Sequence, residues 1–427
     1  MIKTMGDKMI KLNGSVTDST DFFMGIDPFE LTENYGSPLY VYNERILRQN
    51  CRDLRNMCSY PKFKVNFSVK ANNNLTILRI IREEGLKADA MSAGEIHAEL
   101  AAGFSAEDIF FIPNNISEEE MRFAVEHNIL MSADSVSQLK RYGSLNPGSR
   151  VAVRFNPGFG VGFHKNVITA GKKAKLGVNT EQIPEVKDVI KRYNLKLIGI
   201  NQHIGSLFLE KTQFHKSFEV LFDIAKQFED IEFIDLGGGM GIPYHKMEGQ
   251  ERLDLKDMGS TLTEMMTRFS KEYGRELTFI IEPGRYVTAE AGLLLGTVHA
   301  VKYNGPDKYA GTDIGFSVII RPLLYDAHHD VEIYRREGAP SGKQERVNIV
   351  GNICEDGDIV AKDRLLPEIV ENDLIGVLDA GSYGHVMSSN YNNRLRPAEV
   401  LLCNDKSVRL IRRRDTLEDL LRPYINI

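Results

Sequence analysis

The sequence contains no tryptophan and only four cysteines in 427 residues. Cys51, Cys58, Cys354 and Cys403 have neither the spacing of a zinc site nor that of a disulfide framework, so reduced thiols are expected. Long apolar runs are also absent, because lysines interrupt the N-terminal stretch and no later segment approaches the roughly 18 apolar residues of a membrane span. The sequence therefore predicts a cytoplasmic protein.

An excess of charge of one sign is also lacking. Lys and Arg number 53 against 59 Asp and Glu, which gives a net charge of -6 and a pI near 6.0, without long runs of either sign. Nucleic acid and anionic membrane surfaces are therefore not expected partners. The remaining composition, 42% hydrophobic and 26% charged, is that of a folded chain long enough for two domains.

The sequence does contain a regular alternation of short apolar runs and helical patterns. Each run is apolar on both faces, as expected of a strand covered by helices. Helix signals lie between the runs: Asn74 begins one segment, and Ser117 with Glu120 forms a capping box at another. The number of units favours a (β/α)8 barrel of the TIM type over a doubly wound open sheet with the same alternation. The eight runs are residues 65–71, 88–93, 109–113, 130–134, 151–157, 197–205, 232–239 and 278–285.

After about residue 290 the pattern changes to successive strand-like runs without long helices between them, which predicts a C-terminal all-β domain. Thr416 is expected to cap a short closing helix. The segment 164–177, rich in lysine and glycine, is a candidate mobile lid. The expected domains are an N-terminal segment over 1–38 that packs with the β domain, the barrel over 39–290, and the β domain over 291–427.

Polar residues end several of the predicted strands. In a barrel, the C-terminal ends of the strands form the mouth where reactive groups lie. Lys70 follows the first run, and a lysine in such a place can form a Schiff base when desolvation and neighbouring cations lower its pKa. Two classes of enzyme use such a lysine: aldolases, and enzymes that hold pyridoxal phosphate. The residues at these ends are Lys70, Ser92, His203, Gly237 to Gly239, Glu282 and Arg285.

His203, Glu282 and the glycine run suit the second class. Backbone N–H groups of Gly237 to Gly239 can approach a phosphate, and a tight turn without a ligand explains the run equally well. His203 offers a flat ring to cover the pyridine, and Glu282 offers a carboxylate to keep the pyridine nitrogen protonated. Taken singly, His203 reads as a hydrogen-bonded core histidine and Glu282 as an ion-pair partner of Arg285.

Ordered motifs run over nearly the whole chain: FSVKAN, ADAMSAGE, HIGS, DLGGGMGIPY, EPGRYVTAEAG, IRPLLYDAHHDV, CEDGD and SYGHVMSSNYNNRLRPAEV. Together they resemble the alanine-racemase-like barrel group of pyridoxal phosphate enzymes, and within it the diaminopimelate decarboxylases. The resemblance implies decarboxylation of meso-2,6-diaminopimelate to L-lysine and carbon dioxide, in lysine biosynthesis. It also implies a homodimer whose active sites are shared between the subunits.

The resemblance assigns roles to individual residues. Lys70 would carry pyridoxal 5'-phosphate covalently, His203 would stack on its ring, and Glu282 would pair with the pyridine nitrogen. Cys354 would act on the partner subunit's cofactor and give a proton to the carbon left by decarboxylation, since a thiol with a pKa of about 8.5 can be tuned toward neutrality. No metal is expected. The implied cofactor-binding set is Lys70, Asp89, His203, Ser206, Gly237, Gly238, Gly239, Glu282, Gly284, Arg285 and Tyr383.

Substrate recognition is expected to need an acid and cations, because the far end of diaminopimelate carries an ammonium and a carboxylate. Glu355 would bind the ammonium, and Arg285 with Arg321 would bind the carboxylate as bidentate forks. Related ornithine and arginine decarboxylases have Cys-Asp in place of Cys354-Glu355 and lack the arginine. The alternatives are a decarboxylase of another basic or D-amino acid or of a carboxynorspermidine-like substrate, and a non-catalytic regulatory relative. The implied substrate-binding set is Arg285, Arg321, Tyr325, Glu355 and Tyr383.

Overall fold

The computed structural model describes residues 10–13, 15–158, 161–162, 170–171, 174–210, 212–336 and 341–425. The chain divides into two compact units. The β unit comprises residues 1–47, 243–251 and 288–427, and the barrel unit comprises residues 48–242 and 252–287. Most of the candidate lid, residues 164–169 with 172 and 173, lies outside the described residues, as do residues 1–9 and 14 of the N-terminal segment. No described helix is long and apolar enough to cross a membrane.

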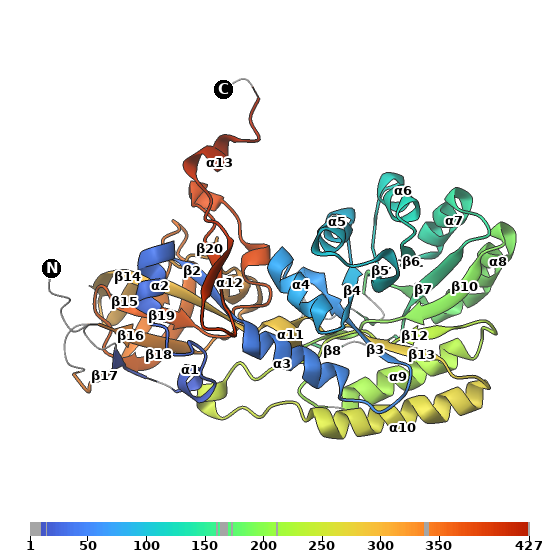
Figure 1. The fold of residues 1–427 in the computed structure, drawn as a ribbon, viewed down its shortest axis with the longest axis horizontal. Helices are drawn as coiled ribbons and strands as arrows, with labels where there is room; N and C mark the ends of the chain where they lie inside the picture. Colours follow the sequence, from blue (N-terminus) through green and yellow to red (C-terminus); the bar gives the residue numbers. More distant parts are fainter. Residues whose placement is uncertain are drawn as a thin grey trace. The chain divides into compact units, whose positions relative to one another are not determined.

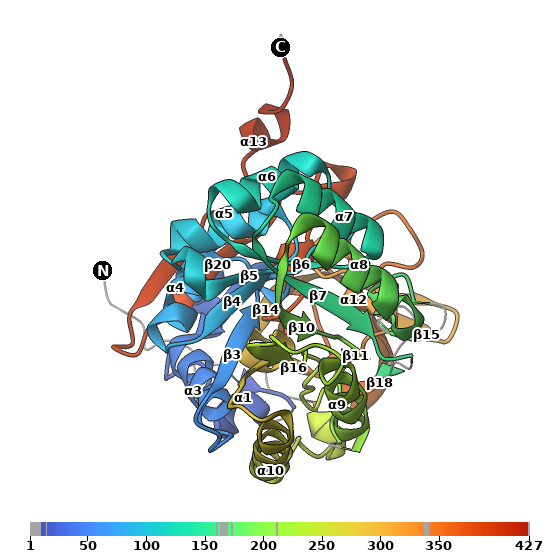
Figure 2. The same ribbon diagram turned by 90° about the vertical axis from the view of Figure 1, so that its right-hand side faces the viewer.

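The described part of the barrel unit contains eight parallel strands in a closed ring (Figures 1 and 2). β10 pairs with β12 on one side and with β7 on the other, which closes the ring. The predicted (β/α)8 barrel is confirmed, and the open sheet is excluded. The strands are β3 (Phe63–Ser68), β4 (Lys87–Ala90), β5 (Ile109–Phe111), β6 (Leu130–Ala133), β7 (Arg150–Asn156), β10 (Lys196–Asn201), β12 (Phe233–Asp235) and β13 (Thr278–Ile281).

Helices cover the outside of this ring (Figure 2). The expected caps are present: Asn74 Oδ1 accepts from the Thr76 N–H at 2.9 Å, and Ser117 with Glu120 forms the capping box. Ser92 also caps a helix, since its Oγ accepts from the Glu95 N–H at 3.2 Å. The helices are α4 (Leu75–Glu83), α5 (Ala93–Ala102), α6 (Glu118–Glu126), α7 (Val136–Leu145), α8 (Ile183–Tyr193), α9 (Thr212–Ala225) and α10 (Leu255–Tyr273).

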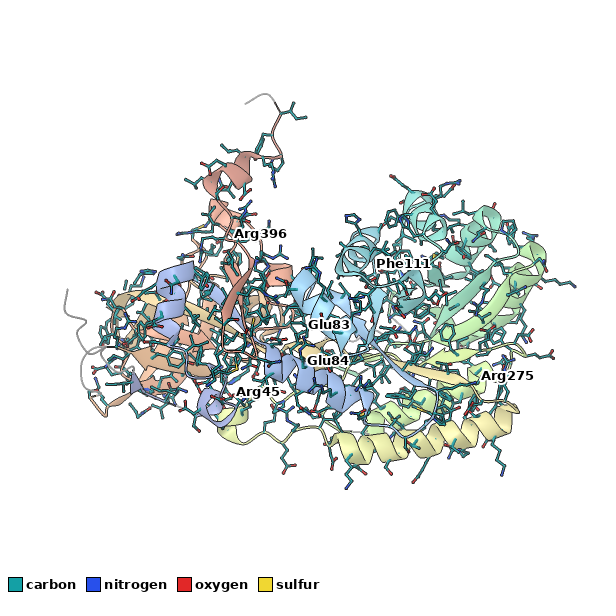
Figure 3. The ribbon with its side chains drawn as sticks, in the orientation of Figure 1. Arg45, Glu83, Glu84, Phe111, Arg275 and Arg396 are labelled. Carbon is teal, nitrogen blue, oxygen red and sulfur yellow. The ribbon has the colours of Figure 1, made fainter. Side chains whose placement is uncertain are left out.

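A carboxylate joins two of the outer helices. Glu84, labelled in Figure 3, follows α4 and faces α3 (Glu44–Arg55). Its Oε1 accepts from Arg48 at 2.9 Å and its Oε2 accepts from Arg52 at 2.7 Å. Glu84 is buried, and such pairing offsets the cost of taking its charge out of water.

The barrel interior is layered. Alternate residues of a strand point to the same side, so each level of the ring contributes one set of inward side chains. The middle layer is apolar, with Phe110 and Phe233 in edge contact at a ring distance of 5.4 Å. Gly199 leaves room for the Phe233 ring, because a Cβ there would lie 2.0 Å from it. The next layer, toward the C-terminal ends of the strands, is polar and contains Ser68, Asp89, Ser132, Arg154, Asn201 and Asp235.

The β unit is built on one large mixed sheet, and the predicted C-terminal all-β domain is confirmed. Thr416 caps α13 (Leu417–Leu421), as expected. Aromatic and aliphatic side chains, among them Phe23, Leu293 and Tyr334, form its core. The strands are β1 (Ile10–Lys11), β2 (Leu39–Asn43), β14 (Gly292–Asn304), β15 (Asp307–Thr312), β16 (Val331–Arg335), β17 (Gln344–Val350), β18 (Ile359–Pro367), β19 (Leu374–Val377), β20 (Ala398–Leu402) and β21 (Val408–Arg412).

Two segments that the sequence assigned to the barrel lie in the β unit. Residues 39–47 do so because β2 pairs with β14 and β20. Residues 243–251 leave the barrel unit between β12 and α10. Lys246 holds this second segment, since its Nζ lies 2.5 Å from Asp379 and 3.1 Å from Glu290.

Candidate active site

Lys70 lies in a short 3-10 turn, η1 (Val69–Ala71), directly after β3. Ser68, two residues earlier, points into the barrel, where its Oγ lies 2.6 Å from Asp89 Oδ2 and 3.0 Å from the carbonyl oxygen of Glu282. Gly284 packs against the same place, because a Cβ on it would lie 3.2 Å from the Ser68 Cβ. The turn that carries Lys70 is therefore fixed to its neighbouring strands β4 and β13.

The glycine run brings His203 and Glu282 together. A Cβ at Gly238 would lie 2.0 Å from the Glu282 carbonyl oxygen and 3.5 Å from His203 Cε1, so only glycine fits. The Gly238 N–H donates to His203 Nδ1 at 3.1 Å. Gly237, with a φ of +77°, approaches equally closely, since its Cβ would lie 2.3 Å from the Gln202 carbonyl oxygen. Close packing at the mouth accounts for these two glycines.

Burial raises the pKa of three carboxyl groups in the polar layer. Glu282 is 6% exposed, and its Oε1 has no hydrogen-bond partner among the described residues. Burial and the charge of Asp235 raise the pKa of Glu282 well above its usual range. Burial likewise raises the pKa of Asp235 to about 7 and the pKa of Asp89 well above its usual range. Burial, with the charges of Lys70 and Arg154, lowers the pKa of His203.

Arg154 is a member of this layer that the sequence reasoning missed. It is 5% exposed on β7, and its Nη1 lies 3.8 Å from Asp134 Oδ1. Its charge lowers the pKa of Glu282, against the larger effect of burial. Asp235 was missed as well. Both are charged residues inside otherwise apolar runs, close to the C-terminal ends of predicted strands, and that position was the available signal.

Ser206 and Arg285, predicted to hold a phosphate, are brought together. Arg285 begins α11 (Arg285–Thr288), and its Nη2 donates to Ser206 Oγ at 3.0 Å. Gly239 lies next to them, because its Cβ would lie 2.6 Å from the carbonyl oxygen of Gly205. A guanidinium, a hydroxyl and a glycine-lined turn therefore meet at one place on the barrel, as an oxyanion site requires.

The β unit holds Cys354 and Glu355 in a separate cluster. The Cys354 thiol is exposed and lies 3.4 Å from Glu355 Oε2 and 3.3 Å from Asn392 Nδ2. The Tyr391 hydroxyl donates to Glu355 Oε1, and this hydrogen bond lowers the pKa of Glu355. The thiol is thus placed between an amide donor and an ionised carboxylate.

The predicted substrate arginine, Arg321, begins α12 (Arg321–Tyr325) and is 1% exposed. Its guanidinium lies 4.6 Å from the centre of the Tyr244 ring, and its Nη1 donates to His329 Nε2 at 2.6 Å. Tyr325 ends the same short helix and is partly exposed. Tyr383 is partly exposed and adopts a left-handed φ of +55°.

The barrel residues fit pyridoxal phosphate. The unpartnered Glu282 Oε1 is a buried acceptor suited to a protonated pyridine nitrogen. A neutral His203 can lie against an aromatic ring without placing a second cation beside it. Ser206 and Arg285 supply donors for a phosphate.

Comparison with known proteins decides the family. Residues 45–289 match the family model of the pyridoxal-dependent decarboxylase, pyridoxal binding domain. The diaminopimelate decarboxylase of Methanothermobacter thermautotrophicus is 40% identical over 93% of this chain and 94% of its own length. The chain belongs to the diaminopimelate decarboxylase family. The Escherichia coli K12 enzyme of that name is 34% identical over 92% of this chain and 94% of its own length.

Solved structures of diaminopimelate decarboxylases have the same fold. The Helicobacter pylori enzyme complexed with L-lysine matches with a TM-score of 0.85 and 30% identity, over 93% of this chain and 99% of that chain. The predicted family, enzyme class and cofactor are therefore confirmed: the chain is a pyridoxal-phosphate-dependent amino acid decarboxylase. The roles given to single residues stay predictions.

Proposed function

We propose that this diaminopimelate decarboxylase removes the carboxylate at the D centre of meso-2,6-diaminopimelate and releases L-lysine and carbon dioxide. The observation that carries the proposal is the 40% identity to a diaminopimelate decarboxylase over 93% of the chain. The L-lysine in the matching Helicobacter pylori structure is the product that this reaction forms.

Pyridoxal phosphate, when bound, supplies the electron sink that accepts the electron pair left by carbon dioxide. Lys70 would hold the cofactor covalently through its side-chain amine. Glu282 Oε1 would accept a hydrogen bond from the pyridine nitrogen, and the neutral His203 ring would lie against the cofactor and exclude water. Ser206, Arg285 and the turn at Gly239 would bind the phosphate; the N–H groups of Gly237 and Gly238, predicted for the same role, donate instead to Asp235 Oδ1 at 2.9 Å and to His203 Nδ1 at 3.1 Å.

The β unit supplies the proton and the distal contacts. The Cys354 Sγ carries the proton that replaces the lost carboxylate. Glu355 binds the distal ammonium, and its lowered pKa keeps it ionised for this purpose. Tyr244 and His329 hold the Arg321 guanidinium, which we assign with Arg285 to the distal carboxylate. Tyr325 and Tyr383 complete the set by hydrogen bonding.

We further propose that two chains form a homodimer in which Cys354 and Glu355 of one chain serve the barrel of its partner. The exposure of the Cys354 thiol on the β unit supports this arrangement. The four cysteines are free thiols, which suits a reducing compartment, and we assign the enzyme to the cytoplasm.

The deciding experiment measures carbon dioxide release from the purified holoenzyme with meso-diaminopimelate, ornithine, arginine and D-lysine in parallel, with Lys70→Ala as the blank. Release from diaminopimelate alone is expected. Release from another of these amino acids instead would show that the substrate assignment is wrong. No release despite bound cofactor would favour a non-catalytic relative.

A mixing experiment tests the shared site. Lys70→Ala and Cys354→Ala are each expected to be inactive, and each leaves one intact half of a site. Random reassortment into dimers should restore about a quarter of the wild-type activity, since half of the dimers are mixed and each mixed dimer has one complete site. Two inactive variants that stay inactive after mixing would place Cys354 beside the cofactor of its own chain.

A further inference from the structure

Cys354 lies in a tight turn of the β unit whose shape is set by one buried carboxylate. Asp358 is 4% exposed; its Oδ2 accepts a hydrogen bond from the Ile353 N–H at 2.8 Å, and its Oδ1 accepts one from the Phe316 N–H at 2.6 Å. The Asp358 N–H in turn donates to the Glu355 carbonyl oxygen at 3.0 Å. These hydrogen bonds fix the backbone on both sides of Cys354 and leave its thiol exposed.

A second segment of the β unit reaches the same thiol. It is the short 3-10 turn η7 (Tyr391–Asn393), and Asn392 in its middle places a side-chain amide beside the sulfur. The amide Nδ2 lies 3.3 Å from Cys354 Sγ, and the amide oxygen Oδ1 lies 3.8 Å from it. The other polar contact of the sulfur among the described residues is Glu355 Oε2 at 3.4 Å.

The turn that carries Asn392 is tied to the chain on either side of the thiol. The hydroxyl of Tyr391, one residue before Asn392, donates to Glu355 Oε1. Arg394, which follows the turn, donates from Nη2 to the Asn352 carbonyl oxygen at 3.0 Å. The amide is therefore held beside the sulfur by the structure of the β unit itself.

The backbone of this turn suits asparagine. Asn392 has a φ of +53°, and Asn393 follows with a φ of +52°. Asparagine tolerates this left-handed region better than most residues with a side chain. Asn393 has the same backbone conformation, but its side chain forms no hydrogen bond with the described residues. The two neighbours thus allow the backbone requirement to be separated from the contact with the thiol.

Delivery of a proton from Cys354 changes the charge of its sulfur. The S–H bond breaks and its electron pair stays on the sulfur as a thiolate, while the proton forms a C–H bond with the electron pair that departing carbon dioxide leaves on carbon. The Glu355 carboxylate opposes this new negative charge, whereas the Asn392 N–H can donate to it. Because hydrogen bonds to a charged acceptor are the stronger ones, the contact with Asn392 gains strength as the proton leaves.

We propose that Asn392 is a positioning residue for proton delivery, whose side-chain N–H holds the Cys354 sulfur and stabilises the thiolate as it forms. This inference rests on the proposed function, in which that thiol supplies the proton. The amide acts on the sulfur and not on the substrate. Its removal should therefore lower kcat and leave KM unchanged.

Kinetics of two variants of the holoenzyme with meso-diaminopimelate test the proposal. Asn392→Gly keeps the left-handed backbone and removes the amide, and Asn392→Asp keeps the size of the side chain but replaces the donor by a second carboxylate. The kcat should fall about tenfold in Asn392→Gly and further in Asn392→Asp, with unchanged KM and cofactor absorbance. Asn393→Gly is the matched control, with the same φ and no hydrogen bond to the sulfur, and should keep the wild-type kcat.

Alkylation of the thiol gives a readout that needs no turnover. Iodoacetamide reacts with the thiolate, and mass spectrometry of the Cys354 peptide follows its rate separately from that of the other cysteines. Asn392→Asp, a side chain of nearly the same size, should slow this reaction about tenfold because its carboxylate opposes the thiolate.

A double variant shows whether the amide acts through the thiol. Asn392→Gly added to Cys354→Ala should lower kcat no further, since the group on which the amide acts is already gone. A purely structural effect of Asn392 would instead lower kcat by the same factor in both backgrounds, and that result would overturn the proposal.

The remaining outcomes separate this inference from the proposed function. If Cys354→Ala lowers kcat while both Asn392 variants keep the wild-type kcat and alkylation rate, the thiol donates the proton and the role of Asn392 is wrong. A fully active Cys354→Ala would overturn both. Equal losses in Asn393→Gly and Asn392→Gly would show that only the shape of the turn matters. If Asn392→Gly fails to fold, Asn392→Asp decides the question.

Discussion

The backbone N–H of Gly238 donates a hydrogen bond to Nδ1 of His203 across 3.1 Å. A ring nitrogen that accepts a hydrogen bond carries no proton, so His203 is neutral with its proton on Nε2. Burial and the charges of Lys70 and Arg154 favour the same state, because they lower the pKa of His203. The glycine run therefore sets the protonation of a side chain as well as the shape of the mouth.

His203 is expected to stay neutral at mildly acidic pH, where an ordinary histidine with a pKa of about 6.5 becomes charged. Below that pH the unfolded chain takes up a proton at this position and the folded chain does not, so His203 lowers stability as the pH falls. Nitrogen NMR of ring-labelled protein across this range should show one protonated and one unprotonated nitrogen throughout. A His203 signal that titrates near 6.5 would refute the assignment.

Glu99 is expected to make the enzyme less stable as the pH rises. It is fully buried on α5, neither of its carboxylate oxygens has a hydrogen-bond partner among the described residues, and burial, with the charges of Asp89 and Glu95, raises its pKa to about 9. The unfolded chain loses this proton near pH 4.3 and the folded chain keeps it. The free energy of unfolding therefore decreases by up to ~1.4 kcal/mol per pH unit between these two values.

Urea unfolding of Glu99→Gln at several pH values measures this effect. The variant, which cannot ionise, should show a flatter dependence of the unfolding midpoint on pH than the wild type. Glu119→Gln is the matched control, an exposed position on the neighbouring helix α6, and should follow the wild type. Equal pH dependence in all three proteins would show that Glu99 ionises normally.

Gly238→Ala should displace the backbone around the active site and thereby lower both stability and activity. The new Cβ would lie 2.0 Å from the carbonyl oxygen of Glu282, and relieving such an overlap costs about 1–3 kcal/mol of stability. Because Glu282 and His203 both contact this glycine, cofactor absorbance and kcat should fall together. Gly94→Ala is the control, since the nearest atom to its Cβ would be Ser92 Oγ at 3.7 Å, and this helical position should gain about 0.5–1 kcal/mol. Similar behaviour of the two variants would mean that the mouth is not tightly packed.

Cys354→Ala should impair proton delivery and leave cofactor binding intact. We expect kcat to fall about 10²- to 10⁴-fold, the usual contribution of a positioned general acid, with unchanged cofactor absorbance. Cys403→Ala, at a partly exposed cysteine after β20, should retain full activity. Steady-state carbon dioxide release measures the activity of both variants. A fully active Cys354→Ala would show that the thiol does not donate the proton.

The sequence predicted the barrel and much of its mouth because both follow from patterns within short stretches of the chain. Lys70, His203 and Glu282 interrupt or follow apolar runs at strand ends, and such positions converge in any barrel. The β unit was harder to predict. Charged residues break the apolar patterns of β15 and β18, which form by pairing with β14 and β17. The placement of residues 243–251 rests on contacts such as Lys246 with Asp379, which lies 133 positions away and leaves no local signal.

The pairing of β2 with β20 has a consequence for the order in which the newborn chain can assemble. Leu39 lies opposite Ala398, and synthesis at about 5–20 residues per second separates their appearance by on the order of tens of seconds. All the barrel strands are complete by Ile281, so the barrel can close while the rest of the chain is still being synthesised. Until β14 appears β2 is a finished strand without a neighbour, and its other edge stays open until β20 is made, so it can pair with other chains. The first tens of residues are thus the part of this enzyme that most needs a chaperone in the cell.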